Sequence, residues 1–478
     1  MIHLLVLLPF FGAFILWLIS DNRLRPKFLP GIALLHLLVT LYLVFTTQTT
    51  HHNGWILLDP LGKVSLLGIS TLFCTCSFYT VGYLSYRPRR PNRVLCLGML
   101  LCLAAMSLVC LSQNLGLMWV AIEATTIAMA PLIYFNRNAR SIEATWKYLL
   151  ICSVGIALAL LGLLFLGYAT HLSGLGATLL LPELLQKGEM LDRHWLHVAF
   201  IFMLTGFGTK LGLAPLHTWK PDAYGEAPGL VGALLSGGLV TCAFLAIARV
   251  YQISLATAVL HSFVQQLLLV MGLLSMAVAA MFMARQNDFK RMLAYSSVEH
   301  VGIMAIGLGL GKGAIFSVFY HLLANGFAKG VLFLSAGNIH RAFGGKTTDV
   351  AQGALRRCPW SGGMFLAGFI AVTGSPPFAL FISEFGIANS AFSQGRYWSG
   401  GLFLLFLAIV FAGMALTVLP VVMGKPVPGQ GETPYHEQPL TVVPPLFMLL
   451  LLLWLGIYPP ESLLLLMQEA AMLLEVQP

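Results

Sequence analysis

Long apolar runs separated by short polar turns recur along the whole chain. Each run is about 18 to 28 residues long, enough for a helix to cross a hydrocarbon core about 30 Å thick. The runs lie near residues 2–20, 28–47, 58–83, 94–111, 115–135, 146–170, 195–217, 228–251, 257–284, 295–311, 313–337, 361–389, 398–423 and 439–458. This pattern predicts an all-α integral membrane protein with about fourteen transmembrane helices. No basic segment precedes the first run, which another run follows directly, so we expect a retained helix rather than a cleaved signal peptide.

The composition supports the membrane class. Hydrophobic residues make up 58% of the chain and charged residues only 9%, whereas an ordinary soluble domain has about 25% charged residues. A soluble fold could not bury so much apolar surface. The connections between the runs are too short to fold alone, so we expect the function to reside within the membrane.

The formal net charge of +9 first suggests a nucleic-acid partner, but the basic residues never form a block. They follow the positive-inside rule instead. If the N-terminus lies outside, nineteen of the 27 Lys and Arg residues, Arg25, Lys220 and Lys290 among them, fall in cytoplasmic connections and four in outer ones. The sequence therefore predicts a multi-pass protein of a cytoplasmic (inner) membrane, with the N-terminus outside and no nucleic-acid partner.

Cysteine usage gives no sign of a metal centre. Seven of the eight cysteines lie in apolar runs, and no CxxC or Cys/His ligand spacing occurs. We therefore expect no cofactor and no metal in this chain.

Two runs contain helix breakers. The seventh run holds Gly206, Gly208, Gly212 and Pro215, and the twelfth holds Gly374, Pro376 and Pro377. Broken helices at corresponding places in two halves are typical of inverted-repeat transporters, in which unwound backbone lines a polar cavity. Two ordinary proline kinks are the alternative interpretation.

Ionisable residues inside the runs are the candidate functional groups. A charge at the bilayer centre costs about 2.5–3.5 kcal/mol, so such groups usually face a bundle interior or water. The candidates are Glu123, Lys210, His217, Glu299, His300, His321, Lys329 and Glu384. A buried lysine with a carboxylate partner can be loaded with a proton and unloaded again, which favours a proton relay; a static ion pair between Glu123 and Lys210 is the alternative. Arg249 ends a run, where its long side chain can reach the interface.

Four segments resemble one family of membrane subunits. They are GTKLGLAPLHTWKPDAYGEAPG (208–229), NDFKRMLAYSSVEHVGIMAIGLG (287–309), HLLANGFAKGVLFLSAGNI (321–339) and SPPFALFISEFG (375–386). The chain resembles the antiporter-like subunits of respiratory complex I, of multisubunit sodium/proton antiporters and of energy-converting nickel–iron hydrogenases. The segments 123–162 and 294–303 are most similar to hydrogenase-type and formate-hydrogenlyase-type subunits.

The resemblance implies a domain organisation and roles for single residues. It implies helices 1–3 over residues 1–93, inverted five-helix repeats over 94–251 and 257–423, and a last helix with the tail over 424–478. Glu123 matches the fifth-helix glutamate, Lys210 its seventh-helix lysine partner, Lys329 the central lysine, His321 a linking histidine and Glu384 the terminal group. The chain departs from the family at Thr241, where an eighth-helix lysine is expected and a hydroxyl cannot act as a titrating group.

The expected function is a non-catalytic membrane subunit that translocates protons or sodium ions, driven by redox chemistry elsewhere in a complex. The resemblance implies other membrane subunits, lipids and a peripheral redox arm as partners. It also implies iron–sulfur and nickel–iron or flavin centres in those partners. Two alternatives stay open: a stand-alone ion or solute transporter, and a transport-deficient scaffold subunit, because Thr241 replaces the lysine.

Overall fold

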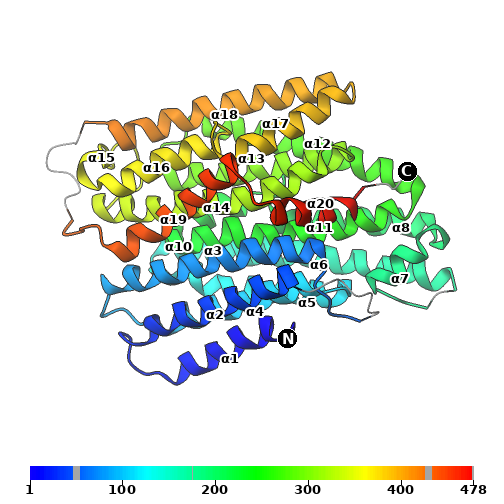
Figure 1. Ribbon diagram of the computed structural model, residues 1–478, viewed down its shortest axis with the longest axis horizontal. Coiled ribbons are helices and arrows are strands. Elements are labelled where there is room, and N and C mark those ends of the chain that lie inside the picture. Colours follow the sequence, from blue (N-terminus) through cyan, green and yellow to red (C-terminus); the bar gives the residue numbers. More distant parts are fainter. Residues whose placement is uncertain (47–53, 175, 426–432, 476–478) are drawn as a thin grey trace.

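The computed structural model describes residues 1–46, 54–174, 176–425 and 433–475. Within these residues the chain is almost entirely helical, and the helices lie side by side along a common axis (Figure 1). The first half contains α1 (Leu4–Leu18), α2 (Arg25–Thr46), α3 (Pro60–Ser85), α4 (Arg93–Leu111), α5 (Leu115–Ile133), α6 (Ala139–Leu172), α7 (Leu181–Gln186), α8 (Arg193–Leu211), α9 (Trp219–Glu226), α10 (Gly229–Ala233) and α11 (Val240–Leu255). The second half contains α12 (Ala258–Met283), α13 (Phe289–Leu310), α14 (Ile315–Phe343), α15 (Ala354–Arg357), α16 (Pro359–Val372), α17 (Ala379–Ser393), α18 (Tyr397–Met423), α19 (Pro439–Ile457) and α20 (Glu461–Met472).

The apolar runs of the sequence all fall on helices. Among the described residues, 11 helices are long and apolar enough to cross a membrane. The remaining three runs fall on the shorter apolar helix α1 and on two broken helices, α8 with α9 and α16 with α17. The prediction of an all-α integral membrane protein is confirmed.

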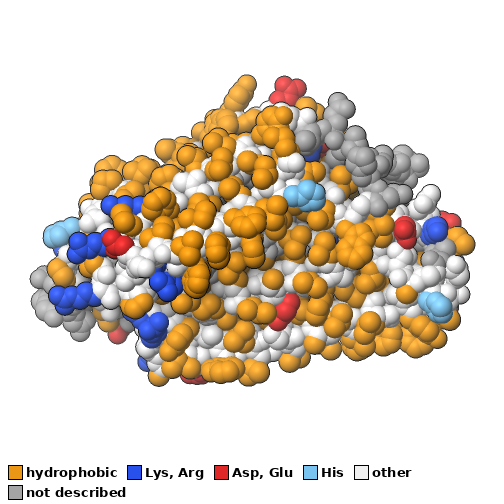
Figure 2. Space-filling view, turned by 90° about the horizontal axis from the view of Figure 1, so that it is seen from below, with side chains coloured by type: hydrophobic (Ala, Val, Ile, Leu, Met, Phe, Trp, Pro, Cys, Tyr) orange, Lys and Arg blue, Asp and Glu red, His pale blue; other side chains and the backbone are white. Residues whose placement is uncertain are grey.

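The outer surface of the bundle is apolar, as a lipid-facing surface must be. Large hydrophobic side chains such as Phe14, Leu38 and Trp398 are exposed, and Figure 2 shows hydrophobic side chains over most of one face. On that face Lys and Arg gather mainly at one end of the bundle (Figure 2). The helices α11, α13 and α14 are buried along almost their whole length, so the polar groups that they carry are shielded from lipid.

Both predicted helix breaks are present, and they are more than proline kinks. Helix α8 ends at Leu211 and α9 starts at Trp219, while α16 ends at Val372 and α17 starts at Ala379, with non-helical chain in between. Each break contains a glycine in the left-handed region, Gly212 at φ 81° and Gly374 at φ 63°, a conformation that is costly for residues with a Cβ atom. Each also contains a cis X-Pro bond, Ala214–Pro215 and Pro376–Pro377.

Arg249 does not reach the membrane interface, so that expectation is wrong. Its guanidinium is fully buried and donates two hydrogen bonds to the carboxylate of Asp59, with Nη1–Oδ2 and Nη2–Oδ1 distances of 2.6 Å each. Asp59 also caps α3 by accepting from the backbone N–H of Gly62. This bidentate pair joins the start of α3 to the end of α11, because a buried guanidinium needs a partner that no lipid supplies.

Several short helices lie outside the predicted spans, α7 and α20 among them. Helix α7 lies in the connection between α6 and α8, and α20 follows the last span and packs against α3 and α14. Their apolar stretches are too short to register as membrane spans.

Candidate ion-translocation site

The first polar cluster lies where α5, α6 and α8 meet. The amine of Lys210 donates to Thr126 Oγ1 at 2.7 Å and to the hydroxyl of Tyr148 at 3.0 Å. Glu123 accepts from Thr126 at 3.0 Å and from Ser153 at 3.0 Å. The two predicted partners, Glu123 and Lys210, are therefore linked through one threonine hydroxyl rather than by a direct ion pair.

Small residues bring these helices close enough for that contact. A Cβ atom on Gly206 would lie 2.4 Å from the backbone nitrogen of Ala159, and one on Gly155 would lie 2.6 Å from Thr209 Cβ. Glycine at such crossings lets helix backbones approach closely. The close packing of α6 on α8 thus sets Lys210 beside Tyr148.

The second cluster lies between α13, α14 and α17. Lys329 is fully buried, and its amine donates to Ser296 Oγ at 2.6 Å. The rings of His300 and His321 share a hydrogen bond between Nδ1 and Nε2 of 3.0 Å, and His321 Nδ1 lies 2.9 Å from Ser383 Oγ. Three helices thereby contribute to two short hydrogen-bonded lines, one from Lys329 to Ser296 and one from His300 through His321 to Ser383.

Two carboxyl groups complete the second cluster. Glu384 lies against the break in α16–α17, where its Oε2 fills the space beside Gly374. Glu299 Oε2 lies 4.0 Å from His300 Nε2. One ring nitrogen or carboxylate oxygen from each of His300, His321 and Glu384 lies within 4.8 Å of the other two. One bridging water can span this spacing.

Some atoms of this cluster have no protein partner. His300 Nε2 and Glu384 Oε1 are buried without a hydrogen bond. Buried polar atoms of this kind usually bind water, and water is also what carries protons between side chains. The donor set of two imidazoles and a carboxylate would equally suit a transition metal, although the His300–His321 hydrogen bond already engages one nitrogen of each ring.

Two predicted residues lie apart from these hydrogen-bonded lines. His217 lies in the break between α8 and α9, beside the ring of Tyr295, and its Nδ1 has no partner. Thr241 follows a π-helical stretch at Leu234–Leu239, and its hydroxyl donates to the carbonyl of Gly237 at 2.6 Å. Such a hydroxyl is engaged by its own helix.

Lys220 is a buried group that sequence reasoning missed. The positive-inside count places Lys220 and Lys290 in cytoplasmic connections, but both side chains are buried. Lys220 is the second residue of α9 and donates to Ser297 Oγ at 3.2 Å. Lys290 donates to the carbonyl of Ala227 at 2.6 Å. Arg25, counted with them, is also buried and bonds to Asn92. One feature of the sequence could have indicated a buried Lys220: it lies five residues after Pro215, near the start of the half-helix that follows the break.

A charged cavity of about 440 Å³ opens beside α6, α9 and α13. Its salt bridges include Lys147–Asp222 at 2.9 Å, Arg291–Asp222 at 2.6 Å and Lys346–Asp288 at 3.0 Å. The cavity is lined by Pro221 and Asp222, which directly follow Lys220 on α9. Water and ions can therefore approach the α9 end of the broken helix.

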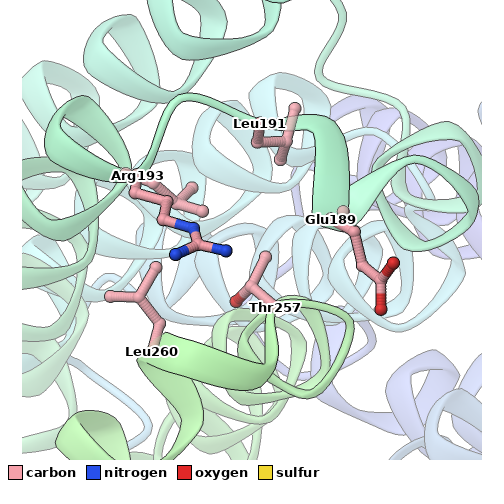
Figure 3. Close-up of a pocket in the computed structure, with 7 residues that line it drawn as sticks. Glu189, Leu191, Arg193, Thr257 and Leu260 are labelled. Carbon is pink, nitrogen blue, oxygen red and sulfur yellow. The ribbon is translucent and has the colours of Figure 1, made fainter.

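A second cavity, of about 260 Å³, lies near the opposite end of the same broken helix, where α8 begins. Figure 3 shows the guanidinium of Arg193 reaching toward Thr257, with Leu260 beside it. Glu189 lines this cavity as well. The broken helix α8–α9 thus has a polar hollow near each of its ends.

Comparison with known proteins gives consistent matches over most of the chain. Residues 112–412 match the family described as NADH:quinone oxidoreductase/Mrp antiporter, TM. A hydrogenase-4 component F homolog from Methylacidiphilum infernorum is 32% identical over 434 residues, which cover 88% of this chain and 90% of the relative.

Solved structures share the fold. A chain of respiratory complex I from Thermus thermophilus with bound NADH has a TM-score of 0.83 and 25% identity, covering 99% of this chain and 100% of that one. A chain of the archaeal membrane-bound sulfane sulfur reductase has a TM-score of 0.89 and 24% identity, covering 99% of this chain and 98% of that one. Both relatives are chains of respiratory membrane complexes.

Proposed function

The chain belongs to the NADH:quinone oxidoreductase/Mrp antiporter family of transmembrane subunits, and from that premise we propose that it carries protons through the two polar clusters described above. It is an antiporter-like membrane subunit of the hydrogenase and complex I type. Its partners are the other membrane subunits of such a complex and a peripheral arm. A stand-alone transporter is not favoured, because the relatives are subunits of larger complexes.

One observation carries the proposal: protonatable groups lie in hydrogen-bonded lines inside a membrane-spanning bundle. Lys210, Lys329 and His321 are all buried, and each bonds to a hydroxyl that can pass on a proton. A charge inside a membrane span is costly, so a buried ionisable group there usually serves a function such as an ion pathway. Lysine and protonated histidine offer only donors and cannot ligate Na⁺, which favours protons over sodium ions as the cargo.

The proposed route follows the predicted residues. In the first half, Glu123 and Lys210 exchange a proton through Thr126, with His217 at the break. In the second half, Lys329 passes its proton toward Glu384 by way of Glu299, His300 and His321. The division into repeats over 94–251 and 257–423 fits this route, since each repeat would hold one broken helix. Five crossings are an odd number, so the second repeat would start from the opposite side of the membrane.

The redox chemistry that drives transport is proposed to lie in partner subunits. Iron–sulfur centres with nickel–iron or flavin would reside there, since the cysteines of this chain show no CxxC or Cys/His ligand spacing. We also propose that the N-terminus faces outward in a bacterial or archaeal cytoplasmic membrane. The gathering of basic side chains at one end of the bundle (Figure 2) supports that orientation.

The test is to remove the amine of Lys329 in the intact complex. Sealed vesicles holding the complex with Lys329→Met should turn over substrate yet take up fewer protons per turnover, measured with a pH-sensitive dye. Lys312→Met is the matched control, because Lys312 is an exposed lysine in the connection before α14. An unchanged ratio of protons to turnover in the Lys329→Met complex would contradict the proposal.

A further inference from the structure

We propose that Lys220 is a proton carrier between the two halves of the subunit and supplies the amine that Thr241 lacks. This inference rests on the proposed function and names a further group on the same route. Lys220 is fully buried near the start of α9. It lies on a half-helix separate from α8, which carries Lys210, and from α14, which carries Lys329.

Toward the second half, Lys220 is separated from Lys329 by two serines. Lys220 Nζ donates to Ser297 Oγ at 3.2 Å, and Lys329 Nζ donates to Ser296 Oγ at 2.6 Å. The two serines are consecutive residues of α13, so both amines contact the same turn of one helix. A hydroxyl both donates and accepts, which suits it for passing a proton between two amines.

Toward the first half, Lys220 packs against the break that follows Lys210. A Cβ atom on Gly212 would lie 2.2 Å from Lys220 Cε and 2.9 Å from its Nζ, so the amine occupies space that only glycine leaves open. The preceding residue, Trp219, donates to the carbonyl of Thr209 at 2.9 Å. Its ring also packs on Tyr148, at a centroid distance of 5.2 Å, and that tyrosine binds Lys210.

The second half repeats this arrangement with the opposite charge. There Glu384 folds back on the left-handed Gly374, and its Oε2 would lie 2.0 Å from an added Cβ atom. In each half, therefore, the half-helix after the break returns one ionisable side chain to the glycine of that break. Lys220 thus resembles Glu384, which is already on the proposed route, in contacting the glycine of its own break.

A purely structural role explains Lys220 less well than it explains Lys290. The amine of Lys290 is held by two backbone carbonyls, those of Ala227 at 2.6 Å and Gly225 at 3.4 Å. Lys220 has one hydrogen bond, to a hydroxyl, and no salt bridge to any carboxylate in the part of the chain that the structure describes. A buried amine with so little compensation is costly and is free to change its proton.

Thr241 cannot fill this position. Its hydroxyl is bonded to Gly237 within its own helix, and it offers no titrating group. The scaffold alternative arises from the missing lysine at that position. With a proton carrier at Lys220, the missing lysine no longer argues for a scaffold without transport.

The experiment compares proton uptake per turnover in vesicles that hold the assembled complex with one of four variants. Lys220→Met should lower the ratio to the value of Lys329→Met. Lys220→Arg should lower it as well, because arginine keeps the charge but does not release its proton in proteins. Lys290→Met is the buried control, and it should reduce the amount of assembled complex without changing the ratio.

The outcomes separate this inference from the proposed function. A wild-type ratio of protons to turnover in Lys220→Met, or a ratio restored by Lys220→Arg, overturns the inference. If Lys329→Met lowers the ratio in the same experiment, the proposed function still stands. Wild-type ratios in both Lys220→Met and Lys329→Met overturn the proposed function itself. If Lys220→Met does not assemble, Ser297→Ala is measured instead: a lowered ratio supports the carrier, and a wild-type ratio overturns it.

Discussion

The buried pair of Arg249 and Asp59 should be costly to break by removing one of its members. Replacing Arg249 with Met keeps much of the side-chain volume but leaves a carboxylate without its partner. The guanidinium is fully buried, and the Asp59 side chain is only 12% exposed. Removing one member of such a buried pair costs about 3–5 kcal/mol, because the remaining charge is uncompensated.

An exposed pair in the same chain provides the matched comparison. Lys147 and Glu143 form a salt bridge of 2.6 Å on α6, with side chains 44% and 64% exposed. Surface pairs of this kind contribute about 0–1 kcal/mol. Glu143→Gln should therefore change stability far less than Arg249→Met, although the two N–O distances are alike.

The assay is the midpoint of thermal unfolding of the purified complex. In a domain of about 150–250 residues 1 kcal/mol moves the midpoint by about 2–4 °C, and by less in a larger chain, so Arg249→Met should lower it by roughly 3–8 °C. The double variant Asp59→Asn with Arg249→Met should recover part of that loss, because asparagine caps α3 as well and carries no charge. Equal midpoints for Arg249→Met and Glu143→Gln, or no recovery in the double variant, would refute the reasoning.

Two further predictions concern the relay. In Gly374→Ala the new Cβ atom would lie 2.0 Å from Glu384 Oε2, and the left-handed backbone would add about 1–2 kcal/mol of strain. We therefore expect fewer protons per turnover. The control is Gly363→Ala, which has nothing within 4 Å of its Cβ position and should behave as wild type. Thr126→Val keeps the shape of the side chain but removes the hydroxyl between Glu123 and Lys210, so proton uptake per turnover should fall. Thr205→Val is its control, because that hydroxyl bonds only to Ile201 within its own helix; the same uptake in both threonine variants would argue against a Thr126 link.

The sequence by itself determined the membrane class, the positions of the spans and the two breaks. These features depend on local properties: hydrocarbon-length apolar runs, and glycine and proline, whose effect on the backbone acts within a few residues. Lys329 and Glu384 could be named for the same reason, since an ionisable residue inside an apolar run stands out without any knowledge of its neighbours.

Only the tertiary structure decided which of these groups meet. Arg249 finds Asp59 190 positions away in the chain, and Thr126 stands between Glu123 and Lys210; neither contact has a local signature. The sequence places Lys220 in a connection because it lies between the apolar runs 195–217 and 228–251. The direction in which a side chain leaves a broken helix is set by the packing around it. Because Gly212 has no Cβ atom, the side chain of this lysine can pack against it in the interior of the bundle.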